Sequence, residues 1–473
     1  MRVSRRETRS RTRPRKGTGG AGTKRRRRSA GADIGKKQLA ALAGGLDDDP
    51  KYRLLHNAVA QVSMSKLASQ RDVIIDADHT FSIMLDSWPV TAQKQTGRCW
   101  MFAGLNLLRP SAAKKLKLAN FEFSQSYVMF WDKLEKANYF LEAMIELADR
   151  PADDRTVAFL LRAPVSDGGQ WDMFVHLVRK YGLVPKSIMP ETESSSASRE
   201  MNRGLVARLR LGAKELRDLA AASASASELR ARKAEIIEAV YRMLAIHLGQ
   251  PPTTFDWQWR DKNRKVHRQP NMTPQKFAAR YVTKALDDYV CLVHDPRPEN
   301  PPGKTYTVEY LGNVWGEGTV KYLNVDIELM RKLSVRSLKA GEPVWFGCDC
   351  SKQMDRGRGL WDVNLRDYEA IYDTTLDMPK ADRLQYGATA MNHAMVFTGV
   401  DLVGGKPRRW RVENSWGEDA GKRGYFLMSD AWFTEHMFEL AVHRSYLPPK
   451  LQKALDTRPR VLPAWDPMGS LAR

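Results

Sequence analysis

Three short stretches of this sequence contain residue types that could together cleave an amide bond. Cys99 follows a glycine-containing turn and begins an apolar run, so it would be the first residue of a helix. There the helix dipole and the free N–H groups favour a thiolate, the nucleophilic form of cysteine. His393 begins an apolar strand, and Asn414 follows the next strand 21 residues later. Because a cysteine nucleophile needs a base, and the base needs an orienting group, the three together predict a cysteine hydrolase.

The elements that must position these residues differ between the two halves of the chain. Residues 205–250 repeat apolar side chains at three- and four-residue spacing, which predicts helix, and Pro251 ends that pattern. Pro110 is expected to close the helix that begins at Cys99. After residue 300 short apolar runs typical of strands appear at 306–310, 344–346, 395–397 and 410–412. A helical front half followed by a β-rich back half predicts an α+β protein.

The positive charge of the chain is concentrated at its N-terminus. The 473 residues carry a formal charge of +21, and residues 1–30, with 13 Lys or Arg and one acid, account for +12 of it. This segment has no hydrophobic periodicity, so residues 1–50 are expected to be a disordered basic tail followed by a linker. The run Lys24–Arg28 could bind nucleic-acid phosphates or act as a nuclear address, or it could be a plain solvated extension.

Composition argues against several other classes. No stretch reaches the roughly 18 apolar residues that span a bilayer, so no membrane partner is expected. Four cysteines make no disulfide scaffold in a chain of this size, and a cytoplasmic location is expected. Cys348 and Cys350 are too close for the usual zinc spacing, and no phosphate-binding or dinucleotide fingerprint occurs. The sequence therefore predicts an enzyme without metal or cofactor.

These stretches resemble the papain superfamily of cysteine peptidases, and within it the bleomycin hydrolase and aminopeptidase C family. Cys99-Trp100 is similar to the nucleophile pair and His393 to the base, while Asn414 to Gly417 resembles the orienting Asn-Ser-Trp-Gly motif. The narrower family is indicated by the stretches at 121–127, 167–172 and 462–469. The resemblance covers roughly residues 50–473. It implies a papain-like fold, with a helical left part, a β-rich right part and a helical insertion.

The resemblance also implies a role for each site residue. The catalytic set is Cys99, His393, Asn414 and Gln93, which lies six residues before the nucleophile as the oxyanion-hole glutamine of the superfamily does. The residues expected to meet the substrate or cover the base are Gly168, Gly169, Trp416, Ala472 and Arg473. The substrates implied are peptides.

Two departures from the superfamily pattern are informative. Secreted papain-like proteases have a disulfide-forming cysteine three residues before the nucleophile, but here that residue is Thr96. Cys99 and His393 are 294 residues apart, whereas the usual spacing is about 130–150 residues. The excess places a helical insertion at about 200–290 in a peptidase body spanning 51–455. In the family such insertions mediate hexamer assembly, so a homohexamer is expected.

The resemblance implies that residues 456–473 form an arm that enters the active-site cleft. The terminal carboxylate of such an arm binds the amino terminus of the substrate, which converts an endopeptidase groove into an aminopeptidase, and Arg473 is a candidate for autocatalytic removal. Two alternatives remain open. One is an ordinary papain-like endopeptidase, and the other is a nucleic-acid-binding protein that acts through residues 1–30.

Overall fold

The computed structural model describes residues 33–47 and 49–472, in two compact units divided between Leu67 and Ala68. In the first unit the described residues form helices α1 (Lys36–Asp47), α2 (Pro50–Val59) and α3 (Met64–Leu67). The expected linker over 31–50 is therefore helical in most of its length, and the larger unit begins at Ala68 rather than at residue 51. The basic segment 1–30 lies outside the described residues.

The start of α2 shows why residues 49–50 belong to a helix start and not only to a linker. Asp49 accepts a hydrogen bond from the backbone N–H of Lys51, and Pro50 lies in the first helical turn. An acidic cap followed by proline is a helix start, not only a sign of a linker. None of the described helices is long and apolar enough to cross a membrane.

Helix α5 (Cys99–Leu116) begins at the predicted nucleophile, but it does not end at Pro110. The proline removes one backbone hydrogen bond, and the helix continues for another six residues. This last part buries Ala112, Ala113 and Leu116 in the main core, which offsets the lost bond. The predicted helix end was therefore wrong, while its start is confirmed.

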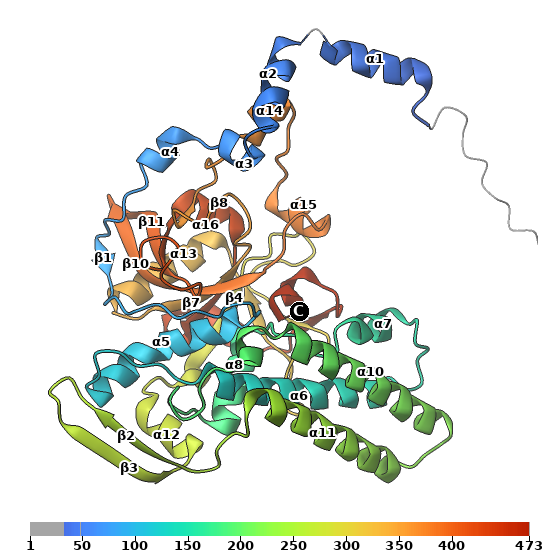
Figure 1. The fold of residues 1–473 in the computed structure, drawn as a ribbon, viewed down its shortest axis with the longest axis vertical. Helices are drawn as coiled ribbons and strands as arrows, with labels where there is room; N and C mark the ends of the chain where they lie inside the picture. The colour runs from blue at the N-terminus through green and yellow to red at the C-terminus, as the bar shows by residue number, and fades with distance from the viewer. Residues whose placement is uncertain (1–32, 48, 473) are drawn as a thin grey trace, which may run out of the picture. The chain divides into compact units, whose positions relative to one another are not determined.

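The helical part of the larger unit is built around α5, α6 (Gln125–Glu146) and α8 (Trp171–Tyr181). Two long helices, α10 (Arg199–Ala221) and α11 (Ala226–Leu248), pack against α6 (Figure 1). The shorter elements are α4 (Arg71–Ile75), α7 (Arg155–Arg162), α9 (Glu193–Ser196), α14 (Tyr368–Tyr372), α15 (Lys380–Gln385), α17 (Pro449–Ala454), η1 (Leu286–Asp288), η2 (Arg444–Tyr446) and η3 (Pro467–Ala472).

The expectation of helix over about 200–290 holds only as far as Leu248. Beyond it, β2 (Phe255–Arg260) and β3 (Val266–Met272) form an antiparallel hairpin, followed by α12 (Pro274–Tyr281). Trp257 stacks on Trp259 at 4.3 Å between ring centroids. Aromatic residues at alternate positions fit one face of a strand, and this period-2 pattern marks the hairpin.

The β-rich half forms a twelve-stranded sheet that confirms the four predicted strand positions. Its order is β14-β5-β6-β4-β13-β7-β10-β11-β12-β9-β8, with β1 paired to β10. The strands are β1 (Ile83–Met84), β4 (Tyr289–Val293), β5 (Thr305–Val308), β6 (Tyr322–Asn324), β7 (Val344–Cys348), β8 (Met354–Asp355), β9 (Leu360–Trp361), β10 (His393–Val403), β11 (Lys406–Glu413), β12 (Tyr425–Ser429), β13 (Met437–His443) and β14 (Arg460–Leu462).

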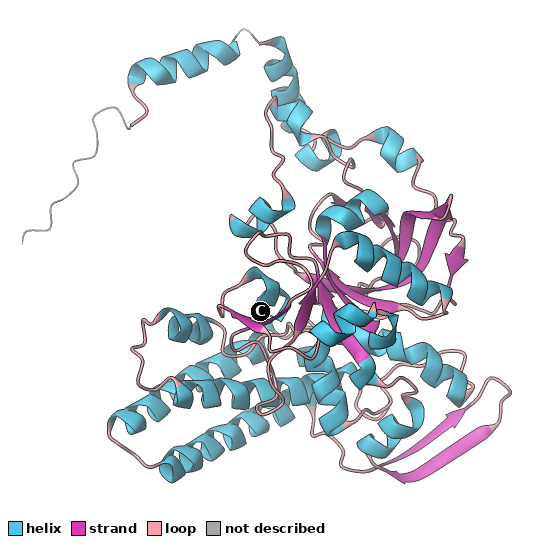
Figure 2. Cartoon of the chain, turned by 180° about the vertical axis from the view of Figure 1, so that it is seen from behind, coloured by secondary structure: helices cyan, strands magenta, loops and turns pink. Residues whose placement is uncertain are grey.

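Figure 2 shows the long helices gathered on one side of the larger unit and most strands on the other. Helix α5 lies between them and packs on β7 and β10, where the indole N–H of Trp345 donates to the carbonyl of Trp100 at 3.0 Å. Helices α13 (Ile327–Lys339) and α16 (Asp430–His436) cover the second core of the sheet. The chain is thus an α+β protein whose nucleophile helix lies at the junction of its two parts.

Candidate active site

Cys99 lies at the first turn of α5 and is almost completely buried. Burial raises the pKa of its thiol to about 11, although backbone hydrogen bonds from Ala394 and Trp100 act in the opposite direction. The helix start therefore lowers the pKa as the sequence predicts, but desolvation has the larger effect. Burial at this position therefore favours the neutral thiol of Cys99 over the thiolate.

His393 and Asn414 are brought together by the register of two antiparallel strands. His393 begins β10, and Asn414 follows the last residue of β11. Because the two strands are antiparallel, both residues lie at the same end of this strand pair. The Nε2 atom of His393 lies 2.9 Å from Oδ1 of Asn414, and this oxygen also accepts the backbone N–H of Ser415 at 2.7 Å.

This arrangement fixes the tautomer of the histidine. Because Oδ1 of Asn414 is an acceptor, Nε2 of His393 must carry the proton. Nδ1 is then the basic nitrogen of the neutral ring. Burial lowers the pKa of His393 to about 4, against the smaller effect of the Asn414 hydrogen bond, so the imidazole rests unprotonated at neutral pH.

Trp416 covers the base. Its ring stacks on His393 with 4.9 Å between centroids and 29° between planes, and the guanidinium of Arg356 lies 4.9 Å from the indole. The structure therefore places Trp416 against the imidazole, where it limits access of water to the His393–Asn414 pair. It is not among the side chains that line the cavity described below.

Gln93 is held so that its side-chain amide keeps one donor free. Oε1 accepts from the hydroxyl of Ser415 at 2.6 Å, and Nε2 donates to the carbonyl of Thr96 at 2.6 Å. A primary amide has two N–H groups, so one remains available for an oxyanion.

A cavity of about 600 Å³ brings the predicted residues together. It is lined by Gln93, Cys99, Gly168 and His393, and also by Ser470 and Leu471 of the C-terminal segment. Ala472 lies beside it, where its carbonyl accepts from the hydroxyl of Ser166 at 2.6 Å, and it lines a neighbouring cavity of about 200 Å³. Arg473 lies outside the described residues.

The two glycines have different surroundings. Gly168 lines the cavity, and its carbonyl accepts a hydrogen bond from Lys136. A Cβ atom on Gly169 would lie 2.3 Å from the indole of Trp100, the residue after the nucleophile. The missing side chain at Gly169 is therefore required for packing against α5, whereas Gly168 lines the cavity.

Comparison with known proteins agrees with this geometry. The sequence profile of the Peptidase C1-like family matches residues 33–469. The chain belongs to this family. Aminopeptidase C of Lactobacillus delbrueckii subsp. lactis is 45% identical over 443 residues, which cover 93% of this chain and 99% of the relative. Bleomycin hydrolase of Homo sapiens is 41% identical over 449 residues, with the same coverage.

The fold comparison gives the same result. The crystal structure of PepW from Lactobacillus rhamnosis matches with a TM-score of 0.91 at 46% identity, over 93% of this chain and 99% of that one. The resemblance to the bleomycin hydrolase and aminopeptidase C family is confirmed. The enzyme class that follows is a hydrolase, a cysteine-type aminopeptidase.

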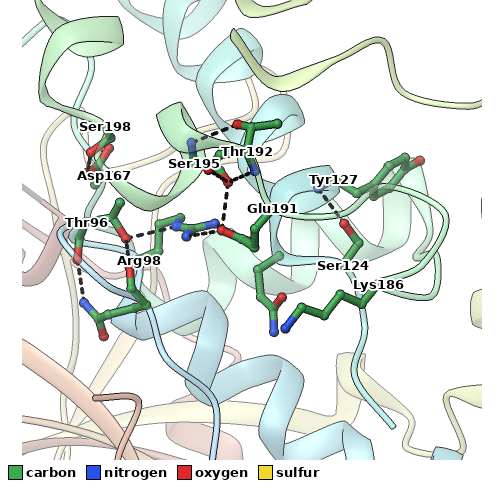
Figure 3. A network of polar contacts seen from close by, with 12 residues as sticks. Thr96, Arg98, Ser124, Tyr127, Asp167, Lys186, Glu191, Thr192, Ser195 and Ser198 are labelled. Carbon is green, nitrogen blue, oxygen red and sulfur yellow. Dashed lines mark hydrogen bonds and ion pairs between the residues drawn. The ribbon is translucent and has the colours of Figure 1, made fainter. Parts of the chain in front are cut away.

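An ion pair between a buried arginine and a partly exposed glutamate holds the loop before Cys99 (Figure 3). Arg98 is fully buried and donates to both carboxylate oxygens of Glu191, at 3.1 and 2.7 Å. Its Nε donates to the hydroxyl of Thr96 at 3.0 Å, and that hydroxyl donates to the carbonyl of Gln93 at 2.7 Å. Burial raises the pKa of Glu191, but the hydrogen bond and charge of Arg98 outweigh it and hold the pKa below its usual value.

Asp167 is a second link to the same loop. Its carboxylate accepts the backbone N–H of Gly97 at 3.1 Å and pairs with Lys133 at 2.5 Å. Burial alone would raise the pKa of Asp167, but Lys133 and the hydrogen bonds of Ser198 and Asn202 hold it well below its usual range. The only sequence signals for these links are a charged residue at the start of an apolar helix and an acid before Gly168. Glu191, 93 residues from Arg98, carries no such signal.

The remaining cysteines form no recognisable metal site. All four cysteines are free thiols, and Cys350 is the only one that is not fully buried. Within residues 33–47 and 49–472, no group of three or more His, Cys, Asp or Glu side chains is arranged to hold a metal ion.

Proposed function

We propose that the chain removes N-terminal residues from peptides through a Cys99–His393–Asn414 triad, and that its C-terminal arm limits it to this exopeptidase action. The observation that carries the proposal is that Ser470 and Leu471 line the same cavity as Cys99 and His393. A peptide bound across this cavity would meet the arm on one side of the nucleophile. The aminopeptidase names of the relatives point in the same direction.

In the first half of the reaction the Cys99 sulfur attacks the carbonyl carbon of the substrate, and its proton passes to Nδ1 of His393. The reacting form is a Cys99 thiolate paired with a His393 imidazolium, because the thiolate is the nucleophilic form of cysteine. The negative charge on the carbonyl oxygen is stabilised by the Cys99 N–H and the free N–H of Gln93, each typically worth about 3 kcal/mol. His393 then gives its proton to the leaving amine as the C–N bond breaks, which leaves a thioester.

In the second half a water molecule gives a proton to His393 and attacks the thioester carbonyl. The C–S bond breaks, the thiolate takes the proton back from His393, and the free amino acid leaves. Asn414 keeps Nδ1 directed to the reaction through both halves, because its Oδ1 accepts a hydrogen bond from the Nε2–H group of His393. Without this partner the ring could rotate or change tautomer.

The arm would select substrates by their free amino terminus. The carboxylate of Arg473, or of Ala472 after trimming, would pair with the ammonium group of the substrate, and a peptide that is blocked or extended at its amino terminus would collide with the arm. Intact-mass measurement of wild type and Cys99→Ala tests the trimming. Identical C-terminal masses would show that Arg473 is not removed autocatalytically.

The central test compares free and N-acetylated aminoacyl fluorogenic substrates. Wild type should cleave only the free form, and Cys99→Ala should lower kcat/KM by at least about 10⁴-fold, because nucleophilic catalysis is lost. Cys350→Ala, which removes the one thiol that is not fully buried, is the matched control and should keep its activity. Substantial activity in folded Cys99→Ala would disprove the triad, and cleavage of the acetylated substrate by wild type would favour an endopeptidase.

Three further expectations rest on sequence alone, and we propose them as such. The family resemblance supports a homohexamer, which light scattering would test, and the cysteine usage supports a cytoplasmic location. The 13 basic residues of segment 1–30 support weak nucleic-acid binding. That binding should fall steeply with salt, survive Cys99→Ala and disappear when residues 1–30 are deleted.

A further inference from the structure

A buried ion pair lies where the C-terminal arm enters the cleft. Arg297 and Asp466 are each more than nine-tenths buried, and Nη2 of Arg297 lies 3.0 and 3.1 Å from the two carboxylate oxygens of Asp466. Asp466 directly precedes η3, whose residues Ser470 and Leu471 line the catalytic cavity. The ion pair therefore joins the base of the arm to the body of the enzyme.

Arg297 is held in position by its own loop, independently of the arm. It donates from Nε and Nη2 to the two carboxylate oxygens of Asp295, at 2.9 and 2.7 Å. Asp295 in turn accepts from the side chain of Asn300 at 2.7 Å. The guanidinium is thus fixed before the arm arrives, which reduces the entropy lost when Asp466 docks.

Asp466 also sets the direction of the arm beyond it. Its Oδ1 accepts the backbone N–H of Met468 at 2.9 Å, at the start of η3. The same carboxylate therefore starts the terminal turn and anchors it to Arg297. Asp466 is the only charged residue in 463–472.

The arm has two other kinds of contact. Met468 and Leu471 are buried in the main core, and the guanidinium of Arg155 lies 3.7 Å from the ring centroid of Trp465. The hydroxyl groups of Tyr322 and Ser166 donate to the carbonyls of Met468 and Ala472, at 3.1 and 2.6 Å, and Ser470 donates to the carbonyl of Met391 at 2.7 Å. These hydrogen bonds join neutral groups, and the charge-assisted pair of Arg297 with Asp466 is stronger than each of them.

We propose that Arg297 is a specificity-determining positioning residue, which holds the arm in the cleft through Asp466 and so restricts the enzyme to substrates with a free amino terminus. The inference rests on the proposed role of the arm. Arg297 does not touch the reacting atoms; it acts through the position of η3. Weakening the pair should release the arm and open the cleft to peptides with a blocked amino terminus and to internal cleavage, with Cys99 chemistry intact.

Asp466→Asn is the sharpest variant. The amide oxygen can still accept the Met468 N–H, and Arg297 keeps its partner Asp295, so the loss is confined to the charge across the interface. The ratio of kcat/KM for an N-acetylated substrate to that for the free substrate should rise about tenfold or more. Asp456→Asn is the matched control, because its pair with Arg444 is exposed, and it should leave the ratio unchanged.

A variant that ends at Ala464 tests the exopeptidase role of the arm separately from the anchoring role of the Arg297–Asp466 pair. If removing the arm does not raise the ratio, the proposed exopeptidase role of the arm fails. If removal raises the ratio but Asp466→Asn does not, the ion pair is not the anchor and this inference is overturned. Hydrogen exchange of residues 465–472 gives a second readout, and unchanged protection in Asp466→Asn would also overturn it.

Discussion

Cys99 and His393 reach the same cavity, but the chain positions them by different means. On the nucleophile side, the loop before α5 is held by side-chain charges, through the pairs Arg98–Glu191 and Asp167–Lys133. On the base side, His393 is held by the backbone ladder of β10 and by two uncharged contacts, the Asn414 amide and the Trp416 ring.

The difference follows from what each backbone can offer. A strand places its residues through many shared hydrogen bonds, so the side chains around His393 need only orient its ring. The loop 93–98 has only isolated backbone hydrogen bonds, from Gln93 to Ser415 and from Gln95 to Ser196, and it must position both Gln93 and Cys99. The ion pairs of Arg98 and Asp167 add rigidity, but they make the loop depend on single residues, because an orphaned buried charge is costly.

The largest expected effect is therefore on the nucleophile side. Glu191→Gln would leave the fully buried guanidinium of Arg98 without its counter-charge, and we expect the free energy of unfolding to fall by about 3 kcal/mol. Urea unfolding of full-length protein measures it. Glu238→Gln, which breaks an exposed pair with Arg242, should cost at most about 0.5 kcal/mol. Equal losses of unfolding free energy in the two variants would show that the Arg98–Glu191 pair stabilises the fold no more than an exposed pair does.

Local patterns predicted the reactive groups, whereas the links that hold them were not predictable. A glycine turn before an apolar run marks the start of α5, and short apolar runs mark β10 and β11, because these signals lie within a few residues. Glu191 meets Arg98 only after the chain has folded, so no local pattern identifies it. Thr96 was recognised only as a missing cysteine, not as the hydroxyl that joins Gln93 to Arg98.

The errors in the fold have similar causes. Pro110 was expected to end α5, but burial of the following turn outweighs one missing hydrogen bond. The range 31–50 was taken as a linker because of its glycines and acids, yet α1 covers Lys36–Asp47. The hairpin at 255–272 was overlooked because the helical pattern before it was extended too far. In each case the outcome depends on what the segment packs against, which local sequence signals do not specify.

On the base side, activity should suffer more than stability. Asn414→Ala removes the acceptor that fixes the His393 tautomer, and we expect kcat to fall about 10- to 100-fold, as for loss of one hydrogen bond to a reacting group. The melting temperature should change less than in Glu191→Gln, because the strands remain paired. Asn364→Ala, in an exposed turn, is the control. A larger loss of stability than of activity in Asn414→Ala would show that the strands around His393 depend on a single side chain, as the loop before α5 does.

The smallest expected effect is on the stability of the protein at acidic pH. The pKa of Glu191 lies below its ordinary value because Arg98 stabilises the carboxylate against the effect of burial. A lowered pKa contributes stability that is complete above the unfolded value, about 4.3, and is lost as pH falls through the folded value. The difference in unfolding free energy between wild type and Glu191→Gln should therefore be constant from pH 7 to about 5 and narrow below that.

Urea unfolding in steps from pH 7 to pH 3.5 measures this difference. His393, whose pKa is lowered to about 4 by burial, makes both proteins lose stability in acid, so its contribution cancels in the comparison. The narrowing by pH 3.5 should be smaller than the full gap of about 3 kcal/mol at pH 7, because the lowered pKa of Glu191 leaves part of its carboxylate ionised and paired with Arg98 at that pH. A gap that stays constant, or that widens in acid, would mean that the loop is held by packing rather than by charge, and the contrast between the two sides of the cleft would be lost.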